Sequence, residues 1–266
     1  MTIQTQTAPI LLERNGAVAT IRFNRPAALN AITLPMAEGF LDVVRTISRA
    51  PDIKVIVLCG AGNAFMAGGD ISLLHADMAA APRTALALLA PLNAALEILT
   101  GMPQLVIASL HGSVVGAGFS VAMACDLMIA ASNTRFNLAF ARIGASPDAS
   151  ATWSLPRAVG LHKALELALL ADSFDAAEAQ RLGLVSRVVP LEELVNETAI
   201  LAQRLAAGPG FAYGKTKQLM RASHARNQKD QMAAECAAIA TCTATDDFAE
   251  GINAFFEKRK PTYTGH

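Results

Sequence analysis

The sequence predicts an α/β fold. Twice along the chain, an apolar run typical of a buried strand leads into a glycine-containing turn and then into a helical pattern. The runs are residues 55–59 and 105–109, and the glycine-containing segments after them are residues 65–70 and 111–118. The length of 266 residues suits one large domain, or one domain with an appendage.

The first elements are expected to be a hairpin, a helix and a buried strand. Residues 10–13 and 18–23 are mostly apolar and flank Asn15-Gly16, a dipeptide typical of hairpin turns. A helix is predicted over residues 33–50, with Thr33 as N-cap and Pro35 in the first turn. Residues 55–59 are continuously apolar, which indicates a strand buried on both faces.

The middle of the chain continues the alternation of helices and strands. Residues 71–83 are apolar and favour a helix, and residues 86–99 predict another that Pro91 breaks or kinks. A strand at 105–109 and a helix at about 117–124 follow, and then strands at 126–130 and 135–138.

After residue 150 the pattern becomes mostly helical. Helices are predicted at 161–171, 176–182 and 190–207, with a short strand at 185–189. Gly208-Pro209-Gly210 interrupts the pattern, and residues up to about 258 are again helical. We therefore expect an α/β core over residues 1–200 and a helical segment over residues 201–266. So thin a segment buries little apolar surface alone, so it should pack on the core or on another subunit.

Composition excludes several classes of function. The formal net charge is zero and only 5% of residues are aromatic, which is unlike a nucleic-acid-binding protein. No apolar run reaches the ~20 residues needed to span a membrane, and residues 1–9 lack the features of a signal peptide. Four cysteines without a Cys-x-x-Cys pair and five scattered histidines favour a reduced, cytoplasmic protein without a metal site.

The two glycine-containing segments carry the strongest chemical signal. Glycine lets the backbone turn sharply and come close to a ligand. The start of a helix also leaves N–H groups unpaired. Two such turns facing each other could hold one oxygen between two N–H donors, which is the geometry of an oxyanion hole. The alternative for each segment alone is a tight turn that caps a helix.

Two other classes of enzyme fit the sequence poorly. Gly112, Gly116 and Gly118 together with Tyr213 and Lys217 imitate a short-chain dehydrogenase, but the glycine turn of that class follows the first strand, and here ~110 residues precede it. A serine hydrolase needs a Gly-x-Ser-x-Gly elbow, which does not surround Ser120.

Several short motifs in this order resemble the crotonase (enoyl-CoA hydratase/isomerase) superfamily over nearly the whole chain. They lie at residues 24–26 with 29–31, 65–70, 111–118 with 124–127, 155–157 with 160, 176–179 with 183–185, and 250–251 with 255 and 258–261. The resemblance implies a spiral core of ββα units with a C-terminal helical oligomerisation segment. It also implies a homotrimer or dimer of trimers, and an acyl-CoA thioester substrate, with no cofactor because coenzyme A is part of the substrate.

The resemblance further implies roles for particular residues. The backbone N–H groups of Ala67 and Ala117 would bind the thioester oxygen. The substrate would also contact residues of both glycine segments and their surroundings, namely Ala28, Leu29, Gly68, Gly69, Asp70, Ile71, Gly116 and Phe140. Hydratases of the family use two glutamates to activate water, but Ser120 and Phe140 stand at those positions here.

One acid remains close by in sequence, Asp148 in Ser146-Pro147-Asp148. Alone it fits a structural role, as a turn residue after proline or as a helix N-cap, as well as it fits a catalytic role. Isomerases of the family that act on epoxyphenylacetyl-CoA carry an aspartate at this position and lack the glutamates, although they have glycines where residues 149–151 are Ala-Ser-Ala. An apolar wall with Phe140 would raise the pKa of Asp148 and a nearby helix start would lower it, and the sequence leaves both open.

These observations predict an acyl-CoA double-bond isomerase with Asp148 as a single base. Two alternatives stay open. One is an enoyl-CoA hydratase, a lyase, whose water would need another base. The other is a non-catalytic acyl-CoA-binding paralogue.

Overall fold

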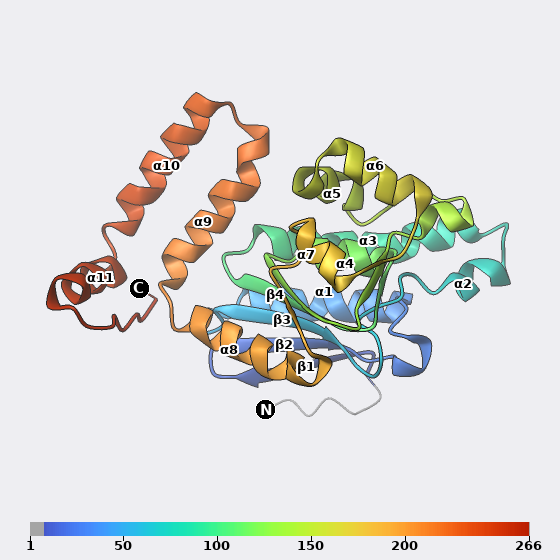
Figure 1. Cartoon of the computed structure of the whole chain (residues 1–266), viewed down its shortest axis with the longest axis horizontal. Coiled ribbons are helices and arrows are strands. Elements are labelled where there is room, and N and C mark those ends of the chain that lie inside the picture. The colour runs from blue at the N-terminus through green and yellow to red at the C-terminus, as the bar shows by residue number, and fades with distance from the viewer. Residues whose placement is uncertain (1–7, 266) are drawn as a thin grey trace.

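A mixed six-stranded sheet forms the centre of the computed structural model, which describes residues 8–265 (Figure 1). The strand order is β1-β2-β3-β4-β6-β9, where β1 and β2 are antiparallel and the other neighbours are parallel. The strands are β1 Ile10–Asn15, β2 Val18–Phe23, β3 Val55–Gly60, β4 Leu105–Leu110, β6 Leu127–Ala131 and β9 Arg187–Val189. This arrangement confirms the predicted α/β class and the N-terminal hairpin.

A smaller three-stranded sheet lies next to the first. It has the order β5-β7-β8, with β5 Ser113–Val115, β7 Arg135–Asn137 and β8 Phe174–Asp175. Only β7 was expected from the sequence. Strands β5 and β8 have three and two residues, too few to show an alternating pattern, and distant partners define them.

Helices cover both faces of the large sheet. The helices α1 (Leu34–Ser48) and α3 (Ala81–Gly101) pack against each other and contribute to the main core. On the other side, Ala202 and Ala206 of α8 (Leu194–Ala206) are buried against β2, β3 and β4. The shorter helices are α2 Ile71–Ala76, α4 Ala117–Met123, α5 Ala151–Val159, α6 Leu161–Leu170 and α7 Ala176–Arg181, and the 3₁₀ turns are η1 Pro26–Ala28, η2 Phe140–Ile143, η3 Leu191–Glu193 and η4 Ser223–Ala225.

The last three helices extend away from the core, in orange and red in Figure 1. They are α9 Gly210–Ala222, α10 Gln228–Cys242 and α11 Asp246–Glu257. Two basic residues of α9 attach it to the core, because Lys217 Nζ lies 2.9 Å and Arg221 Nη2 lies 2.7 Å from the carboxylate of Asp126. Helix α10 has no buried residue. The expected boundary at residue 200 falls inside α8, so the projecting part begins with α9.

Helix α3 corrects the expectation that no segment is long and apolar enough to cross a membrane. By length and composition it is such a helix, with a mean hydropathy of 1.4, and it is the one found within residues 8–265. A search for unbroken apolar runs misses it because Arg83 and Glu97 interrupt the pattern. One stripe of the helix is buried in the core, through Leu92, Ala95, Leu96 and Leu99.

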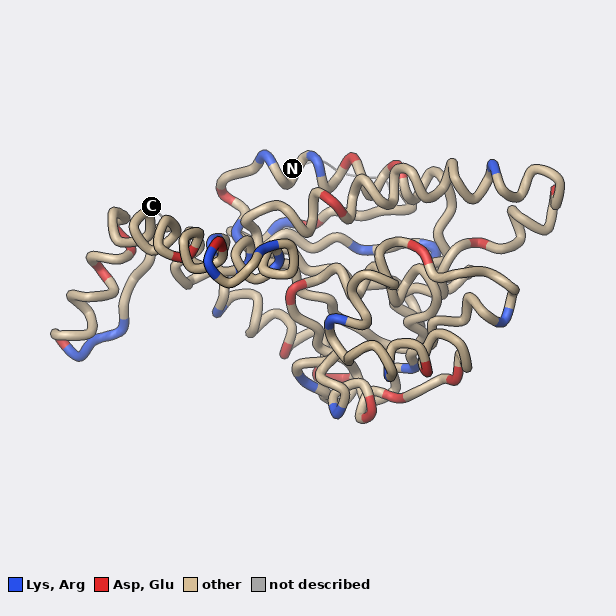
Figure 2. The backbone as a smooth tube through the Cα atoms, turned by 90° about the horizontal axis from the view of Figure 1, so that it is seen from above, with Lys and Arg blue, Asp and Glu red and all other residues tan. Residues whose placement is uncertain are grey.

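Charges of both signs are interspersed along the chain (Figure 2). Across the described residues, no group of three or more His, Cys, Asp or Glu side chains is arranged to hold a metal ion.

Candidate active site

The two glycine segments lie side by side. The Met66 N–H donates to Ser113 O and the Val115 N–H donates to Met66 O, both over 3.0 Å. A methyl group on Gly68 would lie 3.2 Å from Val115 O and 3.6 Å from Ala117 N. The expectation that the two turns face each other is therefore confirmed.

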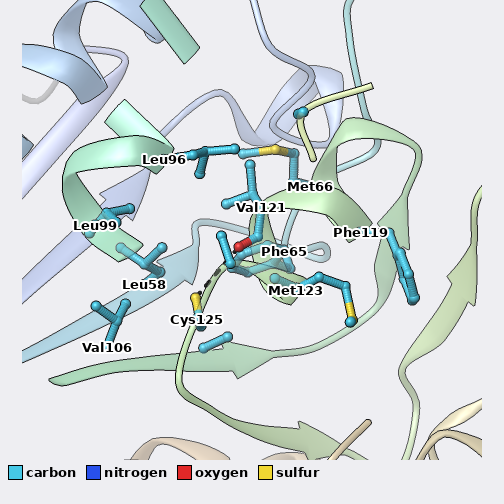
Figure 3. Packing of buried hydrophobic residues seen from close by; sticks show 14 of the residues in the cluster. Leu58, Phe65, Met66, Leu96, Leu99, Val106, Phe119, Val121, Met123 and Cys125 are labelled. Carbon is cyan, nitrogen blue, oxygen red and sulfur yellow. Dashed lines mark hydrogen bonds between the residues drawn. The ribbon is translucent and has the colours of Figure 1, made fainter. Parts of the chain in front are cut away.

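Packing under the segments fixes this arrangement. Phe65 and Met66 of the first segment belong to the same buried cluster as Val121 and Met123 of α4, as Figure 3 shows. A side chain at Gly118 could not be accommodated, because its Cβ would lie 2.3 Å from Met66 O. A glycine at this position lets α4 come into direct contact with the first segment.

The Ala67 N–H is already paired. It donates to Leu29 O over 3.0 Å, which contradicts the expectation that this group is open to a ligand oxygen. The peptide group between Gly68 and Gly69 offers another donor. Its carbonyl oxygen accepts from the Ile32 N–H over 2.8 Å. Because the peptide is trans, the Gly69 N–H points the opposite way, away from Ile32.

Ala117, whose N–H the sequence predicts as the second donor, lies at the start of α4. The carbonyl of Gly116 before it accepts from the N–H groups of Phe119 and Ser120 over 2.9 and 3.2 Å. The same trans-peptide argument directs the Ala117 N–H away from the body of the helix. Gly116 has φ +55°, a left-handed conformation that suits glycine.

The predicted contact residues around the first segment are held in place by a polar network. Asp70 accepts hydrogen bonds from Ser72 Oγ at 2.6 Å and from Arg25 Nη2 at 3.1 Å. The hydrogen bond from Ser72, and then that from Arg25, lower the pKa of the Asp70 carboxyl. Ion pairing with Arg25 therefore gives Asp70 a role in fixing the loop.

An apolar rim borders this network. Ala28 closes the turn η1, and Leu29 follows it in the left-handed region with φ +49°. The side chain of Leu29 is exposed, as is that of Ile71 at the start of α2. Both apolar side chains therefore stand at the edge of the first segment, where a ligand could cover them.

Phe140 forms an apolar wall at the second segment. The residue is buried, and a methyl group on Gly116 would lie 4.0 Å from the tip of its ring. The ring therefore lies beside the peptide group between Gly116 and Ala117, which carries the Ala117 N–H. An aromatic wall at this place limits the access of water to the donor.

Asp148 is brought to the same helix by its backbone. Its carbonyl oxygen accepts from Ser120 Oγ of α4 and from the Ala151 N–H, both over 3.0 Å. Asp148 is therefore a turn residue, but it is not the N-cap of α5. That position belongs to Ser150, and no side-chain hydrogen bond caps the helix.

The Asp148 carboxyl has an unusual environment. Its Oδ1 atom is buried and has no hydrogen-bond partner within residues 8–265. Burial raises the pKa of this carboxyl to about 6. Of the two opposing effects expected from the sequence, loss of solvation therefore prevails over the start of α5.

Two features of this site were not predicted from the sequence. The Gly69 N–H was not assigned as a donor, because the direction of that group depends on pairing with the distant Ile32. The sequence identified Ser120 only as a position where the family glutamate is missing, and its hydrogen bond was not predicted. The available signal was a serine one helical turn after Gly116 in an otherwise apolar helical pattern, because a serine buried with such a helix needs a hydrogen-bond partner.

Fold and site together define a class of protein: an α/β enzyme fold whose paired glycine segments face each other beside an acidic loop. The sequence matches the model of the family described as "Enoyl-CoA hydratase/isomerase" over residues 13–266. The chain belongs to this family, which is that of the crotonase fold.

Similar proteins carry the names of both activities. The chain is 32% identical to the 1,2-epoxyphenylacetyl-CoA isomerase of Escherichia coli (strain K12), over 96% of this chain and 98% of that protein. It is 33% identical to the crotonyl-CoA hydratase of Syntrophomonas wolfei, over 96% and 97% of the two chains. The crystal structure of an enoyl-CoA hydratase from Bacillus anthracis superposes with a TM-score of 0.91, at 29% identity over 97% of this chain and all of that one.

Proposed function

We propose that this protein is an acyl-CoA double-bond isomerase that uses Asp148 as its single base. The observation that carries the proposal is the Asp148 carboxyl, buried without a hydrogen-bond partner in the described chain and tied by its backbone to the helix that presents the Ala117 N–H. An acyl-CoA substrate is consistent with the family.

Two backbone donors would stabilise the negative charge of the reaction. Removal of a proton next to the thioester carbonyl gives a dienolate, whose charge gathers on the carbonyl oxygen. We assign the donors to that oxygen as the N–H groups of Gly69 and Ala117, in place of the pair Ala67 and Ala117. One donor of this kind is worth about 3 kcal/mol in other enzymes. The other predicted contacts would line the path of the substrate, namely Ala28, Leu29, Gly68, Asp70, Ile71, Gly116 and Phe140.

Asp148 would move the proton. With a pKa of about 6 the carboxyl is roughly nine-tenths ionised at pH 7, so it is ready to accept a proton from C2 of a 3-enoyl thioester. The acid so formed returns the proton at C4, which leaves the 2-enoyl thioester. No water takes part, in agreement with the apolar wall at Phe140.

The alternative function, hydration, lacks the pair of acid and base side chains that it would need at the family positions. Addition of water to a 2-enoyl thioester needs a base to activate the water and an acid to protonate C2. The two positions of the family glutamates hold a serine hydroxyl that is fully buried and a phenyl ring. The names of similar proteins include both activities, so the side chains of the site decide our preference.

Exposed apolar residues on the last two helices support an assembly of several subunits. Phe255 and Phe256 at the end of α11 are 76% and 77% exposed, and Ile239 on α10 is also exposed. Such a surface is typical of an interface between subunits. We propose a homotrimer or a dimer of trimers that works in the cytoplasm, with no cofactor other than the coenzyme A of its substrate and no membrane or nucleic-acid partner.

The test is proton exchange in heavy water. Wild type and Asp148→Asn are incubated with a 3-enoyl-CoA in deuterium oxide, and deuterium uptake and the 2-enoyl product are followed. We expect the variant to lose exchange and isomerisation while it still binds the CoA ester. Full activity in the variant would refute the role of Asp148. Hydration of a 2-enoyl-CoA by the wild type would favour a hydratase, and binding without exchange in either protein would favour a non-catalytic paralogue.

A further inference from the structure

Ser120 connects the two halves of the site. It lies in α4, whose first residue, Ala117, presents a backbone donor. The side chain of Ser120 is completely buried. Its hydroxyl donates to the backbone carbonyl of Asp148 over 3.0 Å, while the second oxygen within reach, Gly116 O, is farther away at 3.4 Å.

The loop that Ser120 holds is conformationally strained. Directly after Asp148, Ala149 has φ +47° and Ser150 has φ +67°, in the left-handed region that side chains other than glycine rarely adopt. Two such residues in a row cost free energy that other contacts must offset. The hydrogen bonds from Ser120 Oγ and from the Ala151 N–H to the Asp148 carbonyl are contacts of this kind.

The carboxylate itself is not held by a direct contact at its buried oxygen. Oδ1 of Asp148 has no hydrogen-bond partner within the described part of the chain. The position of that oxygen is therefore set by the backbone of the loop and by packing. A change at the backbone carbonyl would move the base relative to the donors on α4.

We propose that Ser120 is a positioning residue that fixes the Asp148 carboxylate relative to the Ala117 N–H through its hydrogen bond to the Asp148 carbonyl. This inference rests on the proposed role of Asp148 as the base. Ser120 stands at the position where family hydratases have a glutamate. On this proposal its side chain does not contact the reacting atoms, and it instead sets the distance between the Asp148 carboxylate and the Ala117 N–H.

The experiment compares Ser120→Ala with a matched control, Ser109→Ala. Ser109 is also buried and its hydroxyl has one side-chain partner, Thr198 Oγ1 at 3.0 Å, but it lies in β4 against α8. Both variants lose one buried hydroxyl. Isomerisation of a 3-enoyl-CoA is measured over a range of pH, so that kcat, KM and the midpoint of the pH profile are obtained for each protein.

We expect Ser120→Ala to lower kcat on the order of tenfold, because a base displaced by less than 1 Å is already costly. Its KM should stay within about twofold of wild type, since backbone groups bind the thioester. The pH midpoint should move below that of wild type as the carboxylate gains solvent. Ser109→Ala should keep kcat and the midpoint. Unchanged kcat and midpoint in Ser120→Ala, or equal losses in both variants, would overturn the proposal.

A second comparison separates this inference from the proposed function. If Ser120 acts through Asp148, Ser120→Ala should not lower the residual exchange of Asp148→Asn any further, and an equal drop in that background would overturn the proposal. Should Ser120→Ala fail to fold, Ser120→Cys keeps a weak donor and serves in the same assays. Activity retained in Asp148→Asn would refute the base itself, whereas loss in Asp148→Asn with an unchanged Ser120→Ala would refute only the positioning.

Discussion

The burial of the Asp148 carboxyl has a cost in stability that can be measured without any substrate. In the unfolded chain this carboxyl has a pKa near 3.8, and in the folded protein burial raises the pKa to about 6. The folded state therefore binds the proton more tightly. Stability is highest when the group is protonated in both states, falls as pH rises from about 4 to 6, and stays lower above pH 6.

The size of this effect follows from the shift. A difference of about two pKa units corresponds to about 3 kcal/mol at 1.36 kcal/mol per unit. The side chain is only partly buried, so solvent screening reduces the figure, and we take about half of it, ~1.5 kcal/mol. Asp148→Asn, which has no charge to bury, should therefore be more stable than wild type by about 1.5 kcal/mol at pH 8 and by little at pH 4.

Urea denaturation at pH 4, 5, 6 and 8, at one protein concentration, would measure this difference. Asp172→Asn is a suitable control because its side chain is exposed, and its stability relative to wild type should not follow the same course. The reasoning would be refuted by a difference between Asp148→Asn and wild type that is the same at pH 4 and pH 8, or by a variant that is less stable at pH 8.

Three further outcomes follow from the same geometry. The kcat/KM of isomerisation should rise with pH about a midpoint near 6, as Asp148 ionises, and a profile flat from pH 5 to 8 would contradict its role. Gly68→Ala should lower kcat at least tenfold, because φ is +96° and the methyl group would crowd Val115 O at 3.2 Å, whereas Gly101→Ala, with open space around it, should keep full activity. Ser150→Gly should raise the free energy of unfolding by about 0.5 kcal/mol by relieving φ +67°, and no gain in urea denaturation would argue against strain there.

The sequence alone was enough to predict the elements whose patterns are local. The strand β3, the helix α4 and the glycine segments between strands and helices depend on neighbours in the chain, and the structure has them where they were expected. The facing of the two segments was a hypothesis from the sequence, and the structure supplies its reason, because β3 and β4 are parallel and end at the same edge of the sheet.

Features that depend on distant pairing could not be predicted in this way. The Ala67 N–H is taken by Leu29 O, and the Gly69 N–H lies opposite the Gly68 carbonyl that pairs with Ile32, so the choice between the two groups rests on contacts with distant residues. The direction of the pKa shift at Asp148 likewise depends on the burial of its carboxyl in the folded chain. Both are properties of the packed chain and not of any sequence window.

In the proposed site the backbone binds the oxygen and a side chain moves the proton, which explains how one fold can be kept while the side chains of the site differ. On our proposal the donors are backbone N–H groups, which do not depend on the side chains that flank them, provided that glycine keeps the close contact at Gly118. A base, in contrast, is a single side chain and changes with one substitution. On our proposal Ser120 and Phe140 no longer serve a bound water, and the hydroxyl at the first position now places the base at Asp148. A hydratase would need two carboxylates around one water, whereas an isomerase needs one carboxylate held at a fixed distance from the donors. Our proposal takes the second arrangement, because Asp148 is the one carboxylate that we place at the site.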